Sequence, residues 1–318
     1  MTYLSNFLSR FSPNVLWAMG GIVGILVLAT IIVAILKMAK PGKDFGELSM
    51  RVRTWWVMAT VFCLAVTINK RISLVFIAFL SFLALKEYLS MVPTRRAHHR
   101  VLFWAYLAIP FQFLWIGLEW YGMFIIFIPV YMFFILNIRM VAIGDTEDFL
   151  RSAGTLHWGM MITVFSLGHM AYLLVLPSAG NPAGGGPALL LYLVFLTQFN
   201  DVSQYVWGKS FGKHKITPSV SPNKTWEGFL GGFATTLALA FFLAPLLTPL
   251  TRWESILAGT IISVGGFLGD VTISAIKRDL GVKDTGASLP GHGGILDRID
   301  SLTYAAPLFF HFIYYYHY

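Results

Sequence analysis

The amino-acid sequence predicts an all-α, polytopic integral membrane protein of about ten transmembrane helices with short loops, and three observations support this. The 318 residues are 57% hydrophobic, above the roughly 45–50% that is typical of soluble domains, and the mean hydropathy is +0.70. Several apolar runs reach the ~20 residues that a membrane helix needs. Charged residues make up only 12% of the chain. These observations together exclude an ordinary soluble domain.

Ten apolar segments account for the predicted helices. They lie at 14–36, 54–69, 72–91, 101–118, 120–138, 156–177, 187–207, 226–247, 254–276 and 301–316. The first is too long for the 7–15-residue apolar core of a signal peptide, so we expect an uncleaved helix. We divide the chain into an anchor helix with a basic cytoplasmic loop (1–53), N-terminal transmembrane helices (54–186), and a C-terminal transmembrane region (187–318) with cytoplasmic loops 208–225 and 277–300.

The orientation follows from the distribution of lysine and arginine. If the loop 37–53 faces the cytoplasm and the helices alternate, 18 of the 23 Lys and Arg residues lie in cytoplasmic loops and 4 in outer segments. This asymmetry obeys the positive-inside rule and places both chain ends outside. It also explains the net charge of +8 without a nucleic-acid partner. The single cysteine, Cys63, excludes an internal disulfide.

Polar residues interrupt the end of the segment 187–207. Thr197, Asp201 and Gln204 share one helix face, and Asn200 lies beside them. A carboxylate at this depth costs a few kcal/mol unless it is paired or hydrated, which favours a wet cavity for Asp201. Gln204 is equally well explained as a polar contact between helices.

The loop that follows is basic and contains Gly208-Lys209-Ser210. A nucleotide P-loop would also need glycine at 203, where the chain has Ser203, so we reject that motif. The run from Ser221 through Lys224 and Thr225 to Glu227 opens the next helix, and a lysine with free N–H groups at a helix start is typical of an anion site. A solvated loop attracted to anionic lipid at about 1 kcal/mol per cation is the alternative, and both can hold.

A second group of polar residues begins inside the segment 254–276. Asp270, Ser274 and Lys277 share a face with the small residues Ser263 and Gly266. Asp270 lies about as far from the cytoplasmic end of its helix as Asp201 does from the end of its own. Two acidic groups at matched depth, with cations above them, predict a cleft that is open to the cytoplasm.

The loop 277–300 is dense in charge and glycine. Its glycines Gly291, Gly293 and Gly294 flank His292, in a sharply turning segment whose amides can face anionic oxygens. Asp297 and Asp300 are one helical turn apart, and paired carboxylates suit Mg²⁺. Alone, His292 is explained as a satisfied loop histidine and Asp297–Arg298 as a weak surface ion pair. The density of the set favours a phosphate and metal site.

These residues resemble the signature of the phosphatidate cytidylyltransferases, also called CDP-diacylglycerol synthases. That signature reads S-x-x-K-R, four residues, K-D, then P-G-H-G-G, two residues and D-R-x-D. Here it runs without a mismatch from Ser274 to Asp300, and the family's Asn-Asp pair, Ser-Pro-x-Lys-Thr-x-Glu-Gly run and Gly-Asp pair occur upstream. One departure is Val202-Ser203-Gln204-Tyr205, where the family often has Thr-Gly-Ala-Tyr. It indicates a paralogous branch.

The resemblance implies the reaction CTP + phosphatidate → CDP-diacylglycerol + pyrophosphate in a bacterial inner (plasma) membrane, with 187–318 as the catalytic region. It implies Mg²⁺ held by Asp270, Asp297 and Asp300, with room for a second cation, and a homodimer. The catalytic candidates are Asp201, Lys224, Lys277, Arg278, Lys283, Asp284, His292 and Arg298. The substrate-binding candidates are Asn200, Ser221, Thr225, Glu227, Ser274, Gly291, Gly293 and Gly294.

Individual roles follow as hypotheses. Lys277, Arg278, Lys283 and Arg298 would hold the triphosphate or the leaving pyrophosphate, Lys224 would meet the lipid phosphate, and Asp201 would orient a cation or its water. Three other interpretations compete with this one: a transporter lined by the intramembrane aspartates, a related transferase that uses another headgroup such as a sugar phosphate, and an inactive lipid-binding paralogue.

Overall fold

The computed structural model describes residues 12–40, 42, 44–93, 99–144, 146–289, 291 and 293–318. This part of the chain is helical apart from one short antiparallel hairpin. The elements are α2 (Pro13–Ala39), α3 (Gly46–Ile68), α4 (Lys70–Met91), α5 (His99–Gly117), α6 (Tyr121–Ile126), the π-helix η2 (Phe127–Met132), α7 (Phe133–Ile143), α8 (Phe149–Met160), the π-helix η3 (Met161–Phe165), α9 (Ser166–Leu173), the 3₁₀-helix η4 (Ser178–Gly180), α10 (Gly185–Phe211), β1 (Lys215–Thr217), β2 (Ser221–Thr225), α11 (Trp226–Leu247), α12 (Arg252–Asp279), α13 (Leu296–Ile299) and α14 (Leu302–His317).

The predicted fold class is confirmed. Seven helices in the described ranges are long and apolar enough to cross a membrane. The predicted segments 156–177, 187–207 and 301–316 are largely helical but are not among these seven, so the count of ten is not confirmed. Part of the reason is visible in α14, which has only 16 residues, and in α10, whose last turns are polar.

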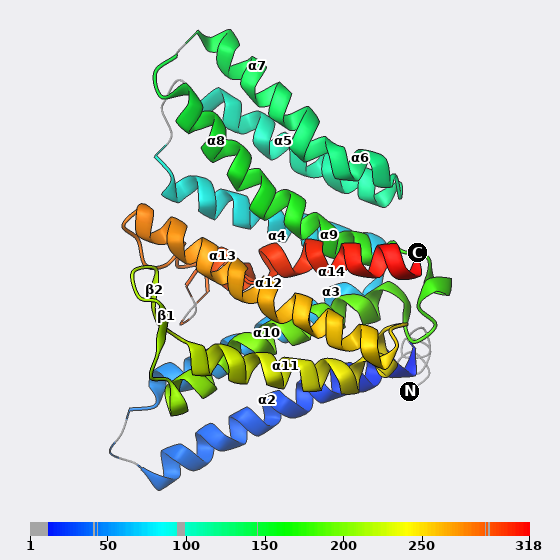
Figure 1. Cartoon of the computed structure of the whole chain (residues 1–318), viewed down its shortest axis with the longest axis vertical. Coiled ribbons are helices and arrows are strands. Elements are labelled where there is room, and N and C mark those ends of the chain that lie inside the picture. Colours follow the sequence, from blue (N-terminus) through cyan, green and yellow to red (C-terminus); the bar gives the residue numbers. More distant parts are fainter. Residues whose placement is uncertain are drawn as a thin grey trace.

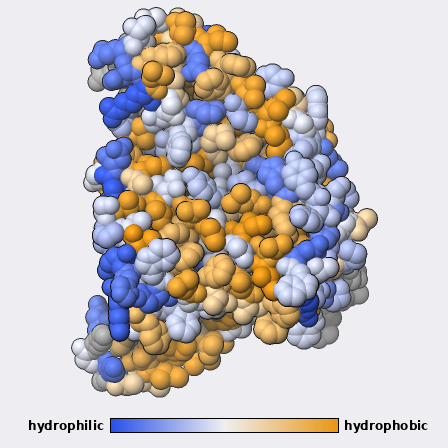
Figure 2. Space-filling model, in the orientation of Figure 1, coloured by the Kyte–Doolittle hydropathy of each residue, from blue (hydrophilic) through white to orange (hydrophobic). Residues whose placement is uncertain are grey.

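The start of α2 and the end of α14 lie at the opposite end of the helix bundle from the hairpin (Figure 1). At one end, the Ser12 hydroxyl before α2 donates to the Ala183 carbonyl at 2.8 Å, and Gly180 lies against the ring of Tyr318. At the other end, β1 and β2 connect α10 to α11. Figure 2 shows apolar residues spread across the middle of the visible face, with hydrophilic residues along its left edge and further ones on its right side.

Helices α10, α11, α12 and α14 pack together, and α10, α11 and α12 carry the predicted residues Asp201, Glu227 and Asp270 among others. Small residues bring them close, since a side chain at Gly259 of α12 would lie 2.8 Å from Ala240 of α11, and small residues permit such an approach in membranes. Caps fix where two of the helices begin. The Thr225 hydroxyl accepts from the Gly228 N–H at the start of α11, and Thr251 with Glu254 forms a capping box on α12.

Asn200 joins three of these helices. Its Oδ1 accepts hydrogen bonds from Thr236 of α11 at 3.0 Å and from Ser263 of α12 at 2.8 Å. Its Nδ2 donates to the Ser263 carbonyl at 3.4 Å, and all three side chains are fully buried. The amide is therefore engaged inside the bundle, so we reassign Asn200 from substrate binding to helix packing, where buried polar groups need such partners.

Candidate active site

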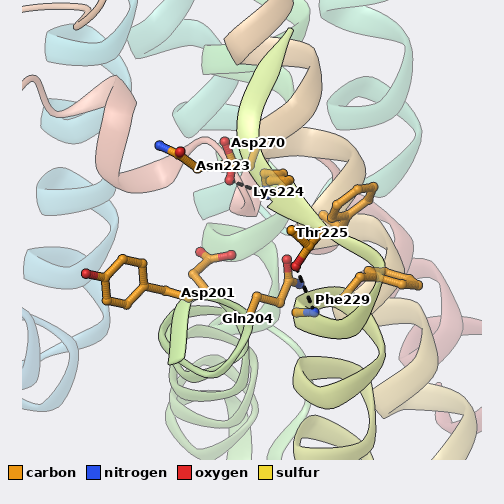
Figure 3. A pocket seen from close by; sticks show the side chains of 10 residues that line it. Asp201, Gln204, Asn223, Lys224, Thr225, Phe229 and Asp270 are labelled. Carbon is orange, nitrogen blue, oxygen red and sulfur yellow. Dashed lines mark hydrogen bonds and ion pairs between the residues drawn. The ribbon is translucent and has the colours of Figure 1, made fainter. Parts of the chain in front are cut away.

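A pocket opens between α10, α11, α12 and β2. Its lining residues are Asp201, Gln204, Tyr205, Asn223, Lys224, Thr225, Gly228, Phe229, Phe267 and Asp270 (Figure 3). The cavity volume of about 170 Å³ holds several waters, each of which takes about 30 Å³ in the liquid. A phosphate group fits this volume, whereas the rest of a nucleotide would extend out of the mouth.

Lys224 brings a positive charge into this pocket from β2. Its Nζ lies 2.6 Å from Asp270 Oδ2, and both side chains are mostly buried. The same Nζ lies 4.7 Å from the centroid of the Phe267 ring, within cation–π range. The hairpin that carries Lys224 is fixed at both ends, because Trp226 N–H donates to the His214 carbonyl at 2.9 Å and Arg278 Nε donates to the Val220 carbonyl at 3.2 Å.

Two carboxylates line the pocket of this lysine, and a third, Asp300, lies close enough to feel their charge. Asp201 and Asp270 line the same pocket from α10 and α12 (Figure 3), and Ser301 donates to Asp201 Oδ2 at 2.8 Å. The other oxygen, Asp201 Oδ1, is buried without a hydrogen-bond partner in the described part of the chain. Asp300 lies in the loop before α14, where burial and then the facing charges of Asp270 and Asp201 raise the pKa of its carboxyl well above the ordinary value. Lys224 balances part of this negative charge through its ion pair with Asp270.

Asp297 has a different environment from the one predicted. Its Oδ1 pairs with Lys277 Nζ at 2.8 Å, and its Oδ2 accepts from the N–H groups of Thr285 and Gly294 and from the Thr285 hydroxyl, at 2.8–3.0 Å. Burial raises the pKa of Asp297, but Lys277 and these N–H groups outweigh it, so the pKa lies below the ordinary value. Both oxygens of Asp297 are therefore occupied, one by Lys277 and the other by Thr285 and Gly294 of the loop 277–300.

The metal ligands that the resemblance implies, Asp270, Asp297 and Asp300, stay a prediction. No group of three or more His, Cys, Asp or Glu side chains in the described ranges is arranged to hold a metal ion. Asp201 lines the pocket with Asp270, and its Oδ1 has no partner among the described residues, whereas Asp297 faces Lys277 and the loop amides.

The structure places the other predicted residues as follows. Ser274 donates to Asp270 at 3.2 Å, and Thr225 lines the pocket while it caps α11. Glu227 accepts the N–H groups of Lys213 and His214, so it closes the hairpin and is no longer proposed to bind substrate. Ser221 is partly exposed on β2, Arg278, Lys283 and Asp284 are exposed, and Arg298 is mostly buried with its Nε unpaired among the described residues.

The glycine-rich segment is described only in part. Gly291 and Gly293 have φ of 74° and 77°, which glycine adopts without strain. Gly294 is buried against Thr285 and Glu87. His292 lies outside the described residues.

Several residues at the site were not predicted from the sequence. Asn223, Phe229 and Phe267 line the pocket, and Ser301 holds Asp201. Asn223 lies inside the Ser-Pro-x-Lys-Thr run, which is the signal that could have found it. Glu87 of α4 contacts the loop 277–300. The sequence feature that could have found it is a single glutamate in an apolar helix.

The fold and the site define a polytopic helical membrane protein with a charged pocket at one end of its bundle. The family model described as "Cytidylyltransferase family" matches residues 49–316, so the chain belongs to this family and is a membrane nucleotidyltransferase. The transporter interpretation is therefore set aside.

Individual relatives refine this assignment. The chain is 45% identical over 291 residues to the uncharacterized protein YnbB of Escherichia coli, covering 92% of this chain and 95% of that one. It is 46% identical over 135 residues to a phosphatidate cytidylyltransferase of Haemophilus influenzae (41% and 47% covered), and 43% identical over 120 residues to that of Staphylococcus haemolyticus (37% and 46%). The matched part spans about half the length of these two enzymes. This pattern is consistent with a paralogous branch.

The contact between α12 and the segment after Asp300 gives a first prediction. A Cβ at Gly269 would lie 2.5 Å from the Asp300 carbonyl oxygen, a backbone atom with little room to move. We expect Gly269→Ala to cost about 1–3 kcal/mol of stability and to lower turnover by up to about 10²-fold through misplacement of Asp300. Thermal unfolding in detergent and cytidylyl transfer measure the two effects.

Gly266→Ala is the matched control in the same helix. Its Cβ would meet atoms no closer than 3.5 Å, which is ordinary van der Waals contact. Equal losses in the two variants would contradict a specific role for the contact at Gly269.

Proposed function

We propose that the protein transfers the cytidylyl group of CTP to phosphatidate, forming CDP-diacylglycerol and pyrophosphate. The observation that carries this proposal is the meeting of Lys224, Asp201 and Asp270 in one pocket at the end of an apolar bundle. A lipid phosphate can enter such a pocket while its acyl chains stay in the bilayer. Membership of the cytidylyltransferase family supports a CTP-dependent reaction.

The chemistry requires one bond to form and one to break. An oxygen of the phosphatidate phosphate attacks the α-phosphorus of CTP, and the bond to the β-phosphate breaks to release pyrophosphate. A phosphate monoester has a second pKa of about 6 and is mostly ionised at neutral pH, so no strong general base is needed. Catalysis then consists of positioning and of neutralising charge.

The chain's own residues divide this work. Lys224 attracts the lipid phosphate, since its ammonium lies in the pocket between Asp270 and the Phe267 ring. The Phe229 and Phe267 rings, 4.7 Å apart at their centroids, exclude water on one side. Lys277, Arg278, Lys283 and Arg298 supply positive charge for the triphosphate and the departing pyrophosphate.

The carboxylates fit a magnesium ion, which is part of the proposal. Mg²⁺ in proteins binds one or two carboxylates together with waters and substrate phosphates, so a closed three-ligand cluster is not needed. Asp201 and Asp270 would hold it, with Asp300 behind them, and the free Asp201 Oδ1 is an available ligand atom. When bound, the ion would neutralise charge on the reacting phosphates. The second cation implied by the resemblance stays a prediction.

We also propose that the pocket faces the cytoplasm of a bacterial inner membrane, because the hairpin end carries the basic loops. The homodimer implied by the resemblance stays a prediction. In a Cys63→Ser background, a membrane-impermeant maleimide applied to intact spheroplasts should label Ala179→Cys in η4 and spare Ser219→Cys at the hairpin, both of which are exposed positions. Permeabilisation should make Ser219→Cys reactive. The reverse labelling pattern would contradict the proposed orientation.

The function is tested with purified protein, CTP, Mg²⁺ and phosphatidate. We expect equimolar pyrophosphate and CDP-diacylglycerol, with no product when Mg²⁺ is chelated. Parallel reactions that keep phosphatidate and replace CTP by sugar phosphates test the alternative headgroup, which the uncharacterized full-length relative leaves open. A lipid product with a sugar phosphate and none with CTP would overturn the CTP assignment, and no product with any of them would overturn the reaction.

A further inference from the structure

Glu87 of α4, in the N-terminal half of the chain, is a buried carboxylate that contacts the loop 277–300. Glu87 is only 8% exposed. Oε1 accepts from the Ser288 hydroxyl at 2.7 Å and from Ile295 N–H at 3.0 Å. Oε2 accepts from Leu296 N–H at 2.9 Å and from the Thr285 hydroxyl at 3.3 Å. Four donors from one loop thus converge on a single side chain.

The loop is shaped to receive this carboxylate. A Cβ at Gly286 would lie 3.1 Å from Glu87 Oε1, and a Cβ at Gly294 would collide with Oε2. The two glycines therefore allow the backbone to approach the carboxylate. Ile295 caps the start of α13 and Leu296 is its first residue, so their N–H groups have no carbonyl of a preceding helical turn to donate to. Glu87 accepts from these N–H groups, which would otherwise be buried without a partner.

Asp297 is a second carboxylate that contacts the same loop. It accepts from Thr285 and Gly294 and pairs with Lys277 of α12. The Thr285 hydroxyl contacts both Glu87 and Asp297, although its one proton can be donated to only one of them at a time. The loop is thus fixed between α4 and α12 by two carboxylates, and Asp300 follows directly from it.

We propose that Glu87 is a positioning residue for the cytidylyl transfer. It acts by holding Thr285, Ser288, Ile295 and Leu296 of the loop 277–300, so that Lys277 and Asp300 stay in place. This inference rests on the proposed function. It assigns a role in the reaction to the N-terminal transmembrane half, which contributes none of the pocket-lining residues given above. Glu87 does not line that pocket, so it acts through the loop and is not a catalytic residue.

The test compares Glu87→Gln with Glu87→Asp. Glutamine presents an NH₂ group where one oxygen accepted, so at least one loop donor loses its partner, while aspartate keeps the charge but is shorter by one CH₂ group. We expect kcat of Glu87→Gln to fall about 10- to 100-fold, as for other residues that orient a site. The KM for phosphatidate should be unchanged because Lys224 lies on a separate element, and Glu87→Asp should recover part of kcat.

A readout without turnover separates this proposal from the proposed function. Amide hydrogen exchange at Ile295 and Leu296 should be about tenfold faster or more in Glu87→Gln, as expected for the loss of a hydrogen bond to a charged group. Glu119→Gln is the control: this exposed glutamate of the same half pairs with Lys70 at 2.6 Å, and its replacement should change neither exchange nor kcat. Ser288→Ala removes one donor from the loop side and should give a smaller change in the same direction, even if Glu87→Gln does not fold.

The outcomes are distinct. Faster exchange with a lower kcat supports the proposal. If exchange is faster in Glu87→Gln but the wild type does not turn over CTP and phosphatidate, the loop contact stands and the proposed reaction is overturned. Unchanged exchange in Glu87→Gln, or in Ser288→Ala where Glu87→Gln does not fold, overturns the proposal, as does a kcat that falls only in proportion to the amount of folded protein.

Discussion

Replacing Asp270 by asparagine should lower turnover about 10²- to 10³-fold in a protein that remains folded, a loss typical of removing one group that stabilises charge in the transition state. Asp270 lines the pocket and pairs with Lys224 at 2.6 Å. The amide removes a hard anionic oxygen from the proposed Mg²⁺ and frees Lys224 from its partner. Initial rates of pyrophosphate release at varied Mg²⁺ measure the effect, and we expect the Mg²⁺ requirement to rise.

Glu254→Gln is the matched control for this substitution. Glu254 lies at the other end of the same helix, where it forms the capping box with Thr251, and glutamine can keep that cap. We expect its turnover to stay near that of the wild type. Near-wild-type turnover of a folded Asp270→Asn variant would refute the role of this carboxylate.

Replacing Lys277 by methionine should remove about 3–5 kcal/mol from the free energy of unfolding, because it leaves the Asp297 carboxylate buried without its counter-charge. The two side chains are 12% and 4% exposed and their charged atoms lie 2.8 Å apart. Methionine keeps much of the length of lysine, so lost charge rather than lost volume dominates. Denaturant or thermal unfolding in detergent measures the change.

The double variant Lys277→Met/Asp297→Asn separates stability from activity. The asparagine oxygen can still accept from the N–H groups of Thr285 and Gly294, while its NH₂ group replaces the oxygen that faced Lys277. We expect most of the stability to return and turnover to stay low, because the phosphates still lack the Lys277 charge. A double variant as unstable as Lys277→Met would show that the pair is not coupled as described.

The sequence predicted the helices well because apolar periodicity and length depend on local composition. The segment predicted at 226–247 coincides with α11, and α12 is only a few residues longer than predicted. The count of spanning helices was less predictable, since α10 carries polar residues for the site and α14 is short. The polar residues at the pocket therefore weaken the hydropathy signal of α10, whereas α11 and α12 remain apolar enough to span a membrane.

The choice among the acidic residues could not be made from the sequence. Asp201, Asp297 and Asp300 are chemically equivalent as ligands, and their roles depend on which neighbours reach them. Ser301 holds one oxygen of Asp201 and leaves the other free, whereas Lys277 and the loop amides occupy both oxygens of Asp297. Glu87 was missed for the same reason, because its four donors lie about two hundred residues away in the chain.

The most direct test of the account is a structure of the wild-type protein determined with CTP and Mg²⁺. We predict density for the phosphates at the mouth of the pocket, an ion contacting Asp201 and Asp270, and Lys224 turned from Asp270 toward the place of the lipid phosphate. Nucleotide density on another face of the bundle, with this pocket unchanged, would contradict the account.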